Sequence, residues 1–271
     1  MDNTNLDIDE IYNALQKHAY ADIPFPLDRS QIEEAVQAFF KFLEEPENIK
    51  THIDFTIAPL HRRGDVGFKH RDPNEDIYND SKEFFHFHPA VFEECSDFLE
   101  QNPTVNDFML KAKIIWDLAY KAVQKTLETL EPKFPGVCDK VFDTDRIHLQ
   151  LRFLKYHWQN SGKYLAKPHY DAGSFTLAIA ESCSGLRIGT SPETLKAVEH
   201  KDSNAIFMLS SNYQKVIDTD QLSAAWHDVI QLDETLIDKP FSRWAVVAFV
   251  DAHGVEALSR TETHKGYRYL D

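Results

Sequence analysis

The sequence is poor in cysteine and has neither a long apolar run nor a leader-like first segment. Its three cysteines, Cys95, Cys138 and Cys183, are widely spaced and form no CxxC pair. Isolated thiols of this kind fit a reducing compartment, where they are expected to be buried and inert. No apolar run approaches the roughly 20 residues of a membrane span, and MDNTNLDIDE lacks the basic and apolar parts of a signal peptide. We therefore expect a soluble, cytoplasmic protein.

Basic residues are also scarce relative to acidic ones. Lys and Arg number 29 against 44 Asp and Glu, which gives a formal net charge of −15. A nucleic-acid backbone or an anionic membrane needs a net basic face, so we expect neither as the main partner. Hydrophobic residues make up 42% of the chain and include 19 Phe. The composition is therefore that of a folded protein with a sizeable core.

The spacing of apolar residues changes at about residue 146. Upstream, helical spacing predicts helices over about 7–19, 30–46, 89–101 and 104–130. Ser30 and Glu33 form a capping-box pattern in the second, and Thr104 is the expected cap of the last. Residues 47–80 predict a charged, turn-rich excursion with one or two short strands. Downstream, short apolar runs predict strands over 147–156, 174–180, 185–189, 204–210, 213–217, 226–232 and 243–250.

These two regions are predicted to form one domain over 1–271, because no repeat and no Gly/Ser/Pro-rich linker separates them. Its N-terminal region, 1–135, is expected to be mainly helical. The region 146–271 is expected to be the β core. A succession of short strands indicates a sandwich or barrel, so the predicted class is α+β.

The strongest chemical signal is a histidine and an acid two positions apart, His169 and Asp171, ahead of the apolar run 175–180. Side chains at i and i+2 of an extended strand point to the same face. Imidazole and carboxylate together suit a divalent metal. A catalytic ion needs a third ligand, which we look for downstream.

Three downstream histidines, His227, His253 and His264, could supply that ligand. We prefer His227, because an apolar strand led by Arg243 follows it. Period-two alternation places Arg243 on one face of that strand with Ala245, Val247 and Phe249. A buried arginine is costly unless an anion meets it, so Arg243 indicates a carboxylate partner. Asp228, Glu234 and a ligand are the partners left open.

The ordered set of His169, Asp171, His227 and Arg243 resembles the pattern of the non-haem Fe(II), 2-oxoglutarate-dependent oxygenases. More narrowly, it resembles their isopenicillin-N-synthase-like branch. His227 follows Asp171 by 56 positions, and Arg243 follows His227 by 16. A lone His-x-Asp is a weak signal, whereas the set in order is specific. The matching stretches are Gly67-Phe68, Asp80 to Phe87, Leu151 to Tyr156, His169 to Leu177, Gly185 to Ile188, His227-Asp228-Val229 and Arg243.

The resemblance implies a double-stranded β-helix, or distorted jelly roll, in the C-terminal half, flanked by N-terminal helices that include one long helix. It implies Fe(II) bound by His169, Asp171 and His227. It also implies 2-oxoglutarate as cosubstrate, with Arg243 pairing its far carboxylate and Tyr156 contacting cosubstrate or substrate. The implied reaction hydroxylates, desaturates or cyclises a small organic substrate with O2, giving succinate and CO2, and needs no catalytic residue beyond the metal centre.

The sequence departs from the family at Ala245, where the family has a serine. The missing hydroxyl bond to the far carboxylate is worth roughly 1.5–3 kcal/mol. This weakens 2-oxoglutarate binding without abolishing it. Two alternatives stay open: an iron oxidase of the same branch that needs no 2-oxoglutarate, and an inactive jelly-roll protein that binds a ligand. His86 and His88, a conceivable second metal pair, are expected to be exposed beside core aromatics.

Overall fold

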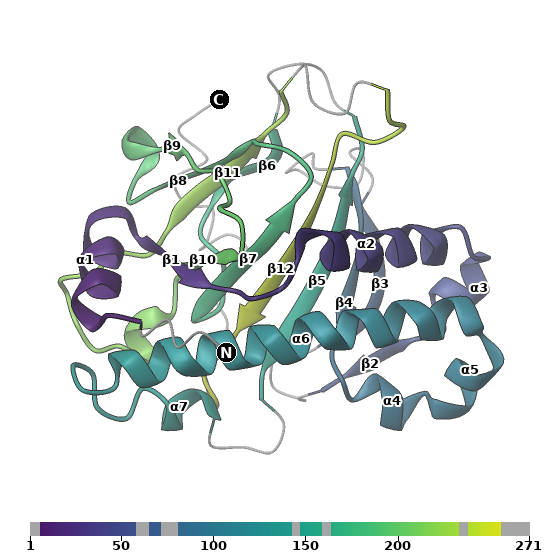
Figure 1. Cartoon of the computed structure of the whole chain (residues 1–271), viewed down its shortest axis with the longest axis horizontal. Helices are drawn as coiled ribbons and strands as arrows, with labels where there is room; N and C mark the ends of the chain where they lie inside the picture. Colours follow the sequence, from purple (N-terminus) through teal and green to yellow (C-terminus); the bar gives the residue numbers. More distant parts are fainter. Residues whose placement is uncertain are drawn as a thin grey trace.

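A computed structural model describes residues 6–57, 65–71, 81–142, 147–158, 164–232 and 238–255. Two antiparallel sheets and a layer of helices make up this part of the chain (Figure 1). In spatial order, the major sheet contains β1 (Tyr20–Pro24), β10 (Asn204–Leu209), β7 (Phe175–Glu181), β12 (Arg243–Val250), β5 (Leu149–Tyr156), β4 (Lys82–Phe87), β3 (Asp65–Arg71) and β2 (Asp54–Thr56). The minor sheet contains β6 (Tyr164–His169), β11 (Trp226–Ile230), β8 (Leu186–Gly189) and β9 (Lys196–Ala197).

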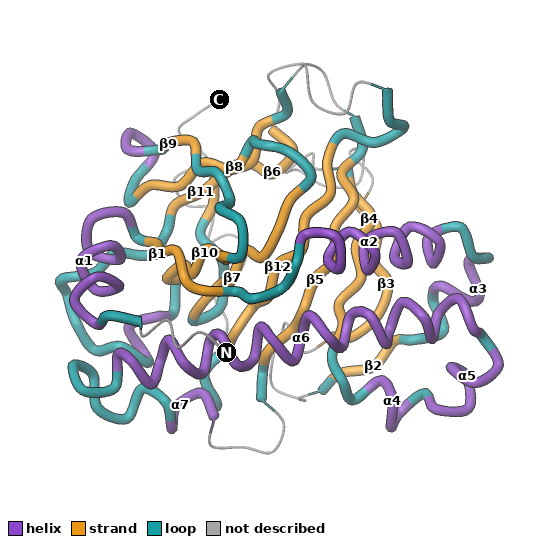
Figure 2. Tube along the Cα trace, in the orientation of Figure 1, coloured by secondary structure: helices purple, strands orange, loops and turns teal. Residues whose placement is uncertain are grey.

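The helices cover one face of the major sheet. They are α1 (Ile8–His18), α2 (Arg29–Leu43), α3 (Glu47–Lys50), α4 (Val91–Glu94), α5 (Ser96–Gln101), α6 (Pro103–Leu130) and α7 (Asp139–Phe142). Figure 2 shows α2 and α6 lying across the same side of the strands. The α+β class is therefore confirmed. Among the described helices, none combines the length and apolar character needed to cross a bilayer.

The long helix α6 holds the outer core together. Its predicted apolar stripe is confirmed, because all its members are buried: Phe108, Ile115, Trp116, Ala119, Val123, Leu127 and Leu130. The Phe108 ring lies 5.0 Å from that of Phe153 on β5 and 5.4 Å from that of Phe39 on α2. The helix therefore joins α2 to the sheet through aromatic contacts.

The predicted helix caps were wrong. Helix α6 begins at Pro103, with Asn102 in the cap position, and not after Thr104. Proline suits the first helical turn, where its missing N–H has no partner to lose. Helix α2 begins at Arg29, with Asp28 as its cap residue. Ser30 already lies inside the helix, so the capping box does not form.

The strands match the apolar runs closely after residue 146, with three exceptions. One is the two-residue strand β9, which no apolar run predicted. The run 213–217 contains a 3-10 turn over Tyr213–Lys215 in place of a strand. The strand β6, which carries His169, corresponds to none of the predicted runs. The N-terminal half also contributes four strands, β1 to β4, to the major sheet. The β core is therefore not confined to residues beyond 146.

Two apolar clusters lie on opposite faces of the major sheet. The larger packs against the helices, and the smaller fills the space between the two sheets. We call the larger cluster outer and the smaller one inner. On β12 the outer cluster contains Trp244, Val246, Ala248 and Val250. The inner cluster contains Ala245, and Val247 packs against it. The alternation predicted for this strand is confirmed.

Candidate metal centre

The three predicted metal ligands converge at one end of the minor sheet. His169 is the last residue of β6, and His227 is its direct partner on the neighbouring strand β11. Asp171 follows two residues after β6 ends, so it reaches the site from a loop and not from the strand itself. One ligand atom from each of the three residues lies within 4.8 Å of the other two. This is the grouping that the sequence predicted.

The side chains are oriented as metal ligands. His169 Nε2 lies 3.7 Å from Asp171 Oδ1, and His227 Nε2 lies 3.6 Å from Asp171 Oδ2. The opposite ring nitrogens face backbone carbonyls: His169 Nδ1 lies 2.6 Å from Lys167 O, and His227 Nδ1 lies 3.1 Å from Ala225 O. A ring that donates through Nδ1 keeps its Nε2 lone pair for a metal. Both histidines therefore present Nε2 to the same point.

The donor set fits Fe(II). Two imidazole nitrogens and one carboxylate on one side of an ion form the facial arrangement used by non-haem iron sites, which leaves the remaining positions open. Asp171 and His227 are each 7% exposed. Burial of this kind excludes bulk water from a bound ion and strengthens its interaction with the carboxylate.

A network of hydroxyl and backbone groups fixes Asp171. Thr176 Oγ1 donates to Asp171 Oδ2 at 2.7 Å and lies 2.9 Å from Ser210 Oγ. Ser211 donates to the Asp171 carbonyl from its backbone N–H at 2.9 Å and from its hydroxyl at 2.7 Å. Thr176 belongs to the sequence signature. The two serines follow β10 and carried no recognisable signal in the sequence.

Gly173 allows the ligand loop to pass close to the end of β12. A Cβ at this position would lie 2.2 Å from Asp251 Oδ1 and 3.2 Å from the Val250 carbonyl. Asp251 Oδ1 in turn accepts the Ser174 N–H at 3.2 Å. The loop that carries Asp171 is therefore clamped between β12 and the segment after β10.

The rival histidine His253 lies outside this cluster. His253 is exposed, and its ring makes an edge-to-face contact with that of His148, with ring centroids 6.3 Å apart. His264 lies outside the described residues. Within the described ranges, the three ligands named above form the one group of at least three such side chains that could hold a metal ion.

His86 and His88 are buried, at 4% and 5% exposure, so the prediction that they are exposed was wrong. The reason is that β4 lies inside the major sheet, between β3 and β5. His86 accepts a hydrogen bond from Arg152 Nε at 2.7 Å and contacts Asp65 O through Nδ1 at 3.2 Å. Burial, with the charge of Arg152 second, lowers the pKa of His86 to about 4.

Arg243 and Tyr156 are cross-strand partners at the other end of the inner face. The Arg243 Cζ atom lies 5.8 Å from the centroid of the Tyr156 ring. Both residues are buried, at 3% and 5% exposure. Burial lowers the pKa of Arg243 to about 10, so the guanidinium stays charged at neutral pH.

The carboxylate that meets Arg243 belongs to Glu181, at the end of β7. It is neither of the two protein partners suggested by the sequence. Asp228 forms a bidentate pair with Arg187, at 2.8 and 2.5 Å, and Glu234 lies outside the described residues. Sequence reasoning missed Glu181, although it is the residue in contact with the predicted anion anchor.

No protein-family model matches the sequence, and no curated protein matches it. Solved structures do resemble the fold. A full-length Neurospora crassa protein in complex with alpha-KG matches with a TM-score of 0.64 and 17% identity, over 91% of this chain and 79% of that one. The dioxygenase for auxin oxidation 1 from Arabidopsis thaliana, in complex with 2-oxoglutarate, matches with a TM-score of 0.64 and 16% identity, over 94% and 91%.

A third match is JOX2 in complex with 2OG, Fe and JA, with a TM-score of 0.66 and 15% identity, over 97% of this chain and 80% of that one. At this level of identity the likeness establishes the fold. The chain shares the fold of these solved structures, with the jelly-roll core that the sequence resemblance predicted.

Proposed function

We propose that the protein is an Fe(II)- and 2-oxoglutarate-dependent oxygenase that oxidises a small organic substrate with O2. The observation that carries this proposal is that His169, Asp171 and His227 lie together at one end of the minor sheet. The fold supports it, because solved structures with the same core contain 2-oxoglutarate, and one of them also contains Fe.

In this proposal each part of the site has one task. His169, Asp171 and His227 hold Fe(II), which supplies the oxidation chemistry when bound. Arg243 is the charged anchor for the far carboxylate of 2-oxoglutarate, and Tyr156 borders it on β5. The inner apolar cluster excludes water from the space between the two sheets. Succinate and CO2 are the expected coproducts.

The substrate is proposed as a small molecule. The Arabidopsis protein named above is a dioxygenase for auxin oxidation, and JOX2 was crystallised with JA. Hydroxylation, desaturation and cyclisation all fit the site. We also propose a cytoplasmic location, because Cys95, Cys138 and Cys183 are free thiols.

The proposal is tested by adding Fe(II) and then 2-oxoglutarate to the protein without oxygen. A visible charge-transfer band is expected when a 2-oxo acid chelates the bound iron. His169→Ala should abolish the band, while His253→Ala, which changes an exposed histidine outside the cluster, should leave it intact. A well-folded wild-type protein that binds Fe(II) but gives no band with 2-oxoglutarate would refute the cosubstrate.

A second candidate is an iron oxidase that needs no 2-oxoglutarate. Two observations favour it: Ala245 lacks the hydroxyl of the family's serine, and Arg243 already contacts an internal carboxylate. The two candidates differ in stoichiometry. Release of one succinate per substrate oxidised supports the 2-oxoglutarate enzyme, whereas oxidation without succinate supports the oxidase.

A further inference from the structure

The contact between Arg243 and Glu181 occupies the part of the guanidinium that a bound carboxylate would need. Glu181 Oε2 contacts Nη2 of Arg243, and the two side chains are 6% and 4% exposed. Arg243 Nε donates to the Cys183 carbonyl at 3.3 Å. A guanidinium binds a carboxylate in a bidentate manner either through Nε and Nη2 or through Nη1 and Nη2. Both arrangements include Nη2, so a bound carboxylate would have to share this atom with Glu181.

A β-bulge directs Glu181 to this place. Strand β7 pairs with β12, and the register passes from Val247 opposite Ala178 to Val246 opposite Ala180. Ile179 is therefore an extra residue on β7. Regular alternation from Thr176 and Ala178 would turn Glu181 toward the helices, whereas the extra residue turns it to the inner face.

The residue opposite Glu181 is Ala245. Directly opposed side chains of an antiparallel pair start about 5 Å apart, so a larger residue at position 245 would compete with Glu181 for space. The family's serine is replaced here by the smallest side chain with a Cβ. Ala245, which lacks the hydroxyl of the family's serine, is therefore the direct cross-strand neighbour of Glu181, which supplies the carboxylate.

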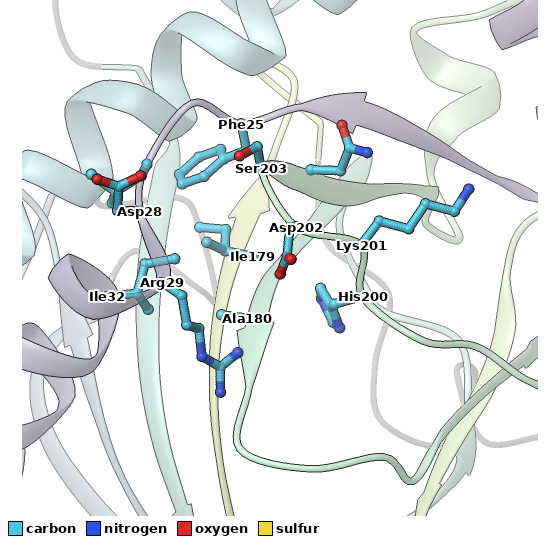
Figure 3. A pocket seen from close by; sticks show the side chains of 12 residues that line it. Phe25, Asp28, Arg29, Ile32, Ile179, Ala180, His200, Lys201, Asp202 and Ser203 are labelled. Atoms are coloured by element: carbon cyan, nitrogen blue, oxygen red, sulfur yellow. The ribbon is translucent and has the colours of Figure 1, made fainter.

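Glu181 is held from its other side as well. Its Oε1 lies 3.3 Å from His200 Nδ1, and its backbone carbonyl accepts a hydrogen bond from Arg29 Nη2 at 2.7 Å. His200 and Arg29 line a cavity of about 320 Å³ between β7, α2 and the segment before β10. In the view of Figure 3, Ala180 of β7 lies between these two side chains.

We propose that Glu181 is an internal competitor for the far carboxylate of 2-oxoglutarate at Arg243, so that the cosubstrate binds only when Glu181 leaves Nη2. This inference rests on the proposed function, since it concerns the same anchor. A second carboxylate entering beside Glu181 would bring two buried negative charges to one arginine, and buried like charges repel strongly. Glu181 therefore lowers the affinity of the iron site for 2-oxo acids that carry a second carboxylate.

The test measures binding without turnover. Fe(II)-loaded protein is titrated without oxygen with 2-oxoglutarate and, separately, with pyruvate, a 2-oxo acid that has no far carboxylate. Glu181→Gln keeps the size of the side chain and removes its charge, so the Kd for 2-oxoglutarate should fall at least tenfold while that for pyruvate stays unchanged. The additional change Arg243→Gln should remove this gain.

Glu83→Gln is the matched control, because it removes a carboxylate from β4 that pairs with Lys155 at 3.3 Å and not with Arg243. It should leave both affinities at the wild-type value. If Glu181→Gln does not fold, Glu181→Asp replaces it: the shorter side chain keeps the charge but withdraws it from Nη2, and should tighten 2-oxoglutarate binding in the same direction.

The outcomes separate the inference from the proposed function. If the wild type binds 2-oxoglutarate and Glu181→Gln binds it no more tightly, or less tightly, the competitor role is wrong and the oxygenase proposal stands. If Fe(II) binds but 2-oxoglutarate binds to none of the proteins, the cosubstrate itself is wrong and the inference falls with it.

Discussion

Replacement of Thr176 by valine tests whether the hydroxyl on Asp171 helps to hold the metal. Valine has nearly the same shape, so the change removes the hydrogen bond of 2.7 Å to Asp171 Oδ2 without opening a cavity. Thr176 is 1% exposed, and water therefore cannot replace the lost donor. A hydrogen bond to a charged group contributes about 1.5–3 kcal/mol, and each 1.4 kcal/mol is tenfold in affinity. We expect Fe(II) binding to weaken by about 10–100-fold, as for other outer partners of metal ligands.

The assay is calorimetric titration with Fe(II) in the absence of oxygen. The matched control is Thr126→Val, because Thr126 is also fully buried and its hydroxyl donates to a backbone carbonyl, Ala122 O, at 2.8 Å in α6. Both variants should lose some stability, but only Thr176→Val should lose metal affinity. The reasoning is refuted if Thr176→Val binds Fe(II) within twofold of the wild type, or if the control weakens binding as much.

Two further predictions concern the ligand loop and the inner face. Gly173→Ala should lower the free energy of unfolding by about 1–3 kcal/mol and weaken Fe(II) binding. The reason is that the added Cβ would lie 2.2 Å from Asp251 Oδ1 and displace it. Urea unfolding and metal titration that both match the wild type would contradict this. His86 is buried and has a pKa of about 4, against 6.5 in the unfolded chain. Between these pH values the unfolded chain therefore binds more protons than the folded chain. The free energy of unfolding should fall by about 3 kcal/mol as the pH falls from 6.5 to 4. Urea unfolding across this range should show a smaller pH dependence for His86→Gln, and an equal dependence in both proteins would contradict the assignment.

The grouping of the candidate metal ligands could be predicted because each lies in or beside a recognisable strand. His169 precedes an apolar run, and His227 is the second residue of another, so local pattern and spacing were enough to predict that they lie together. The strand 243–250 was predicted with its observed bounds, and the alternation of its faces placed Arg243 on the inner side. Residues with a strong local pattern were therefore placed correctly.

Glu181 could not be predicted, because its orientation depends on a bulge. The run Phe175 to Ala180 is apolar at almost every position, so the sequence shows no alternation that a one-residue shift would disturb. Both registers of β7 look equally good in the sequence. Only the pairing with β12 reveals that Ile179 is the extra residue.

Strands β1 and β4 of the N-terminal half were missed for a different reason, whereas the short strands predicted within 47–80 are present as β2 and β3. Strand β1 is short and ends in proline, and its partner is β10, with Tyr20 opposite Met208. Pairing between segments so far apart is decided by tertiary packing, not by local propensity. The same holds for His86, whose burial requires β3 and β5 on either side of β4.

The most direct test of the account is a crystal structure of the protein prepared with Fe(II) and 2-oxoglutarate in the absence of oxygen. We predict an anomalous iron peak bound by Nε2 of His169, Nε2 of His227 and a carboxylate oxygen of Asp171. We also predict the far carboxylate of 2-oxoglutarate at Arg243, with Glu181 withdrawn from Nη2. An iron peak elsewhere, or none among these three side chains in protein that contains iron, would contradict the central claim.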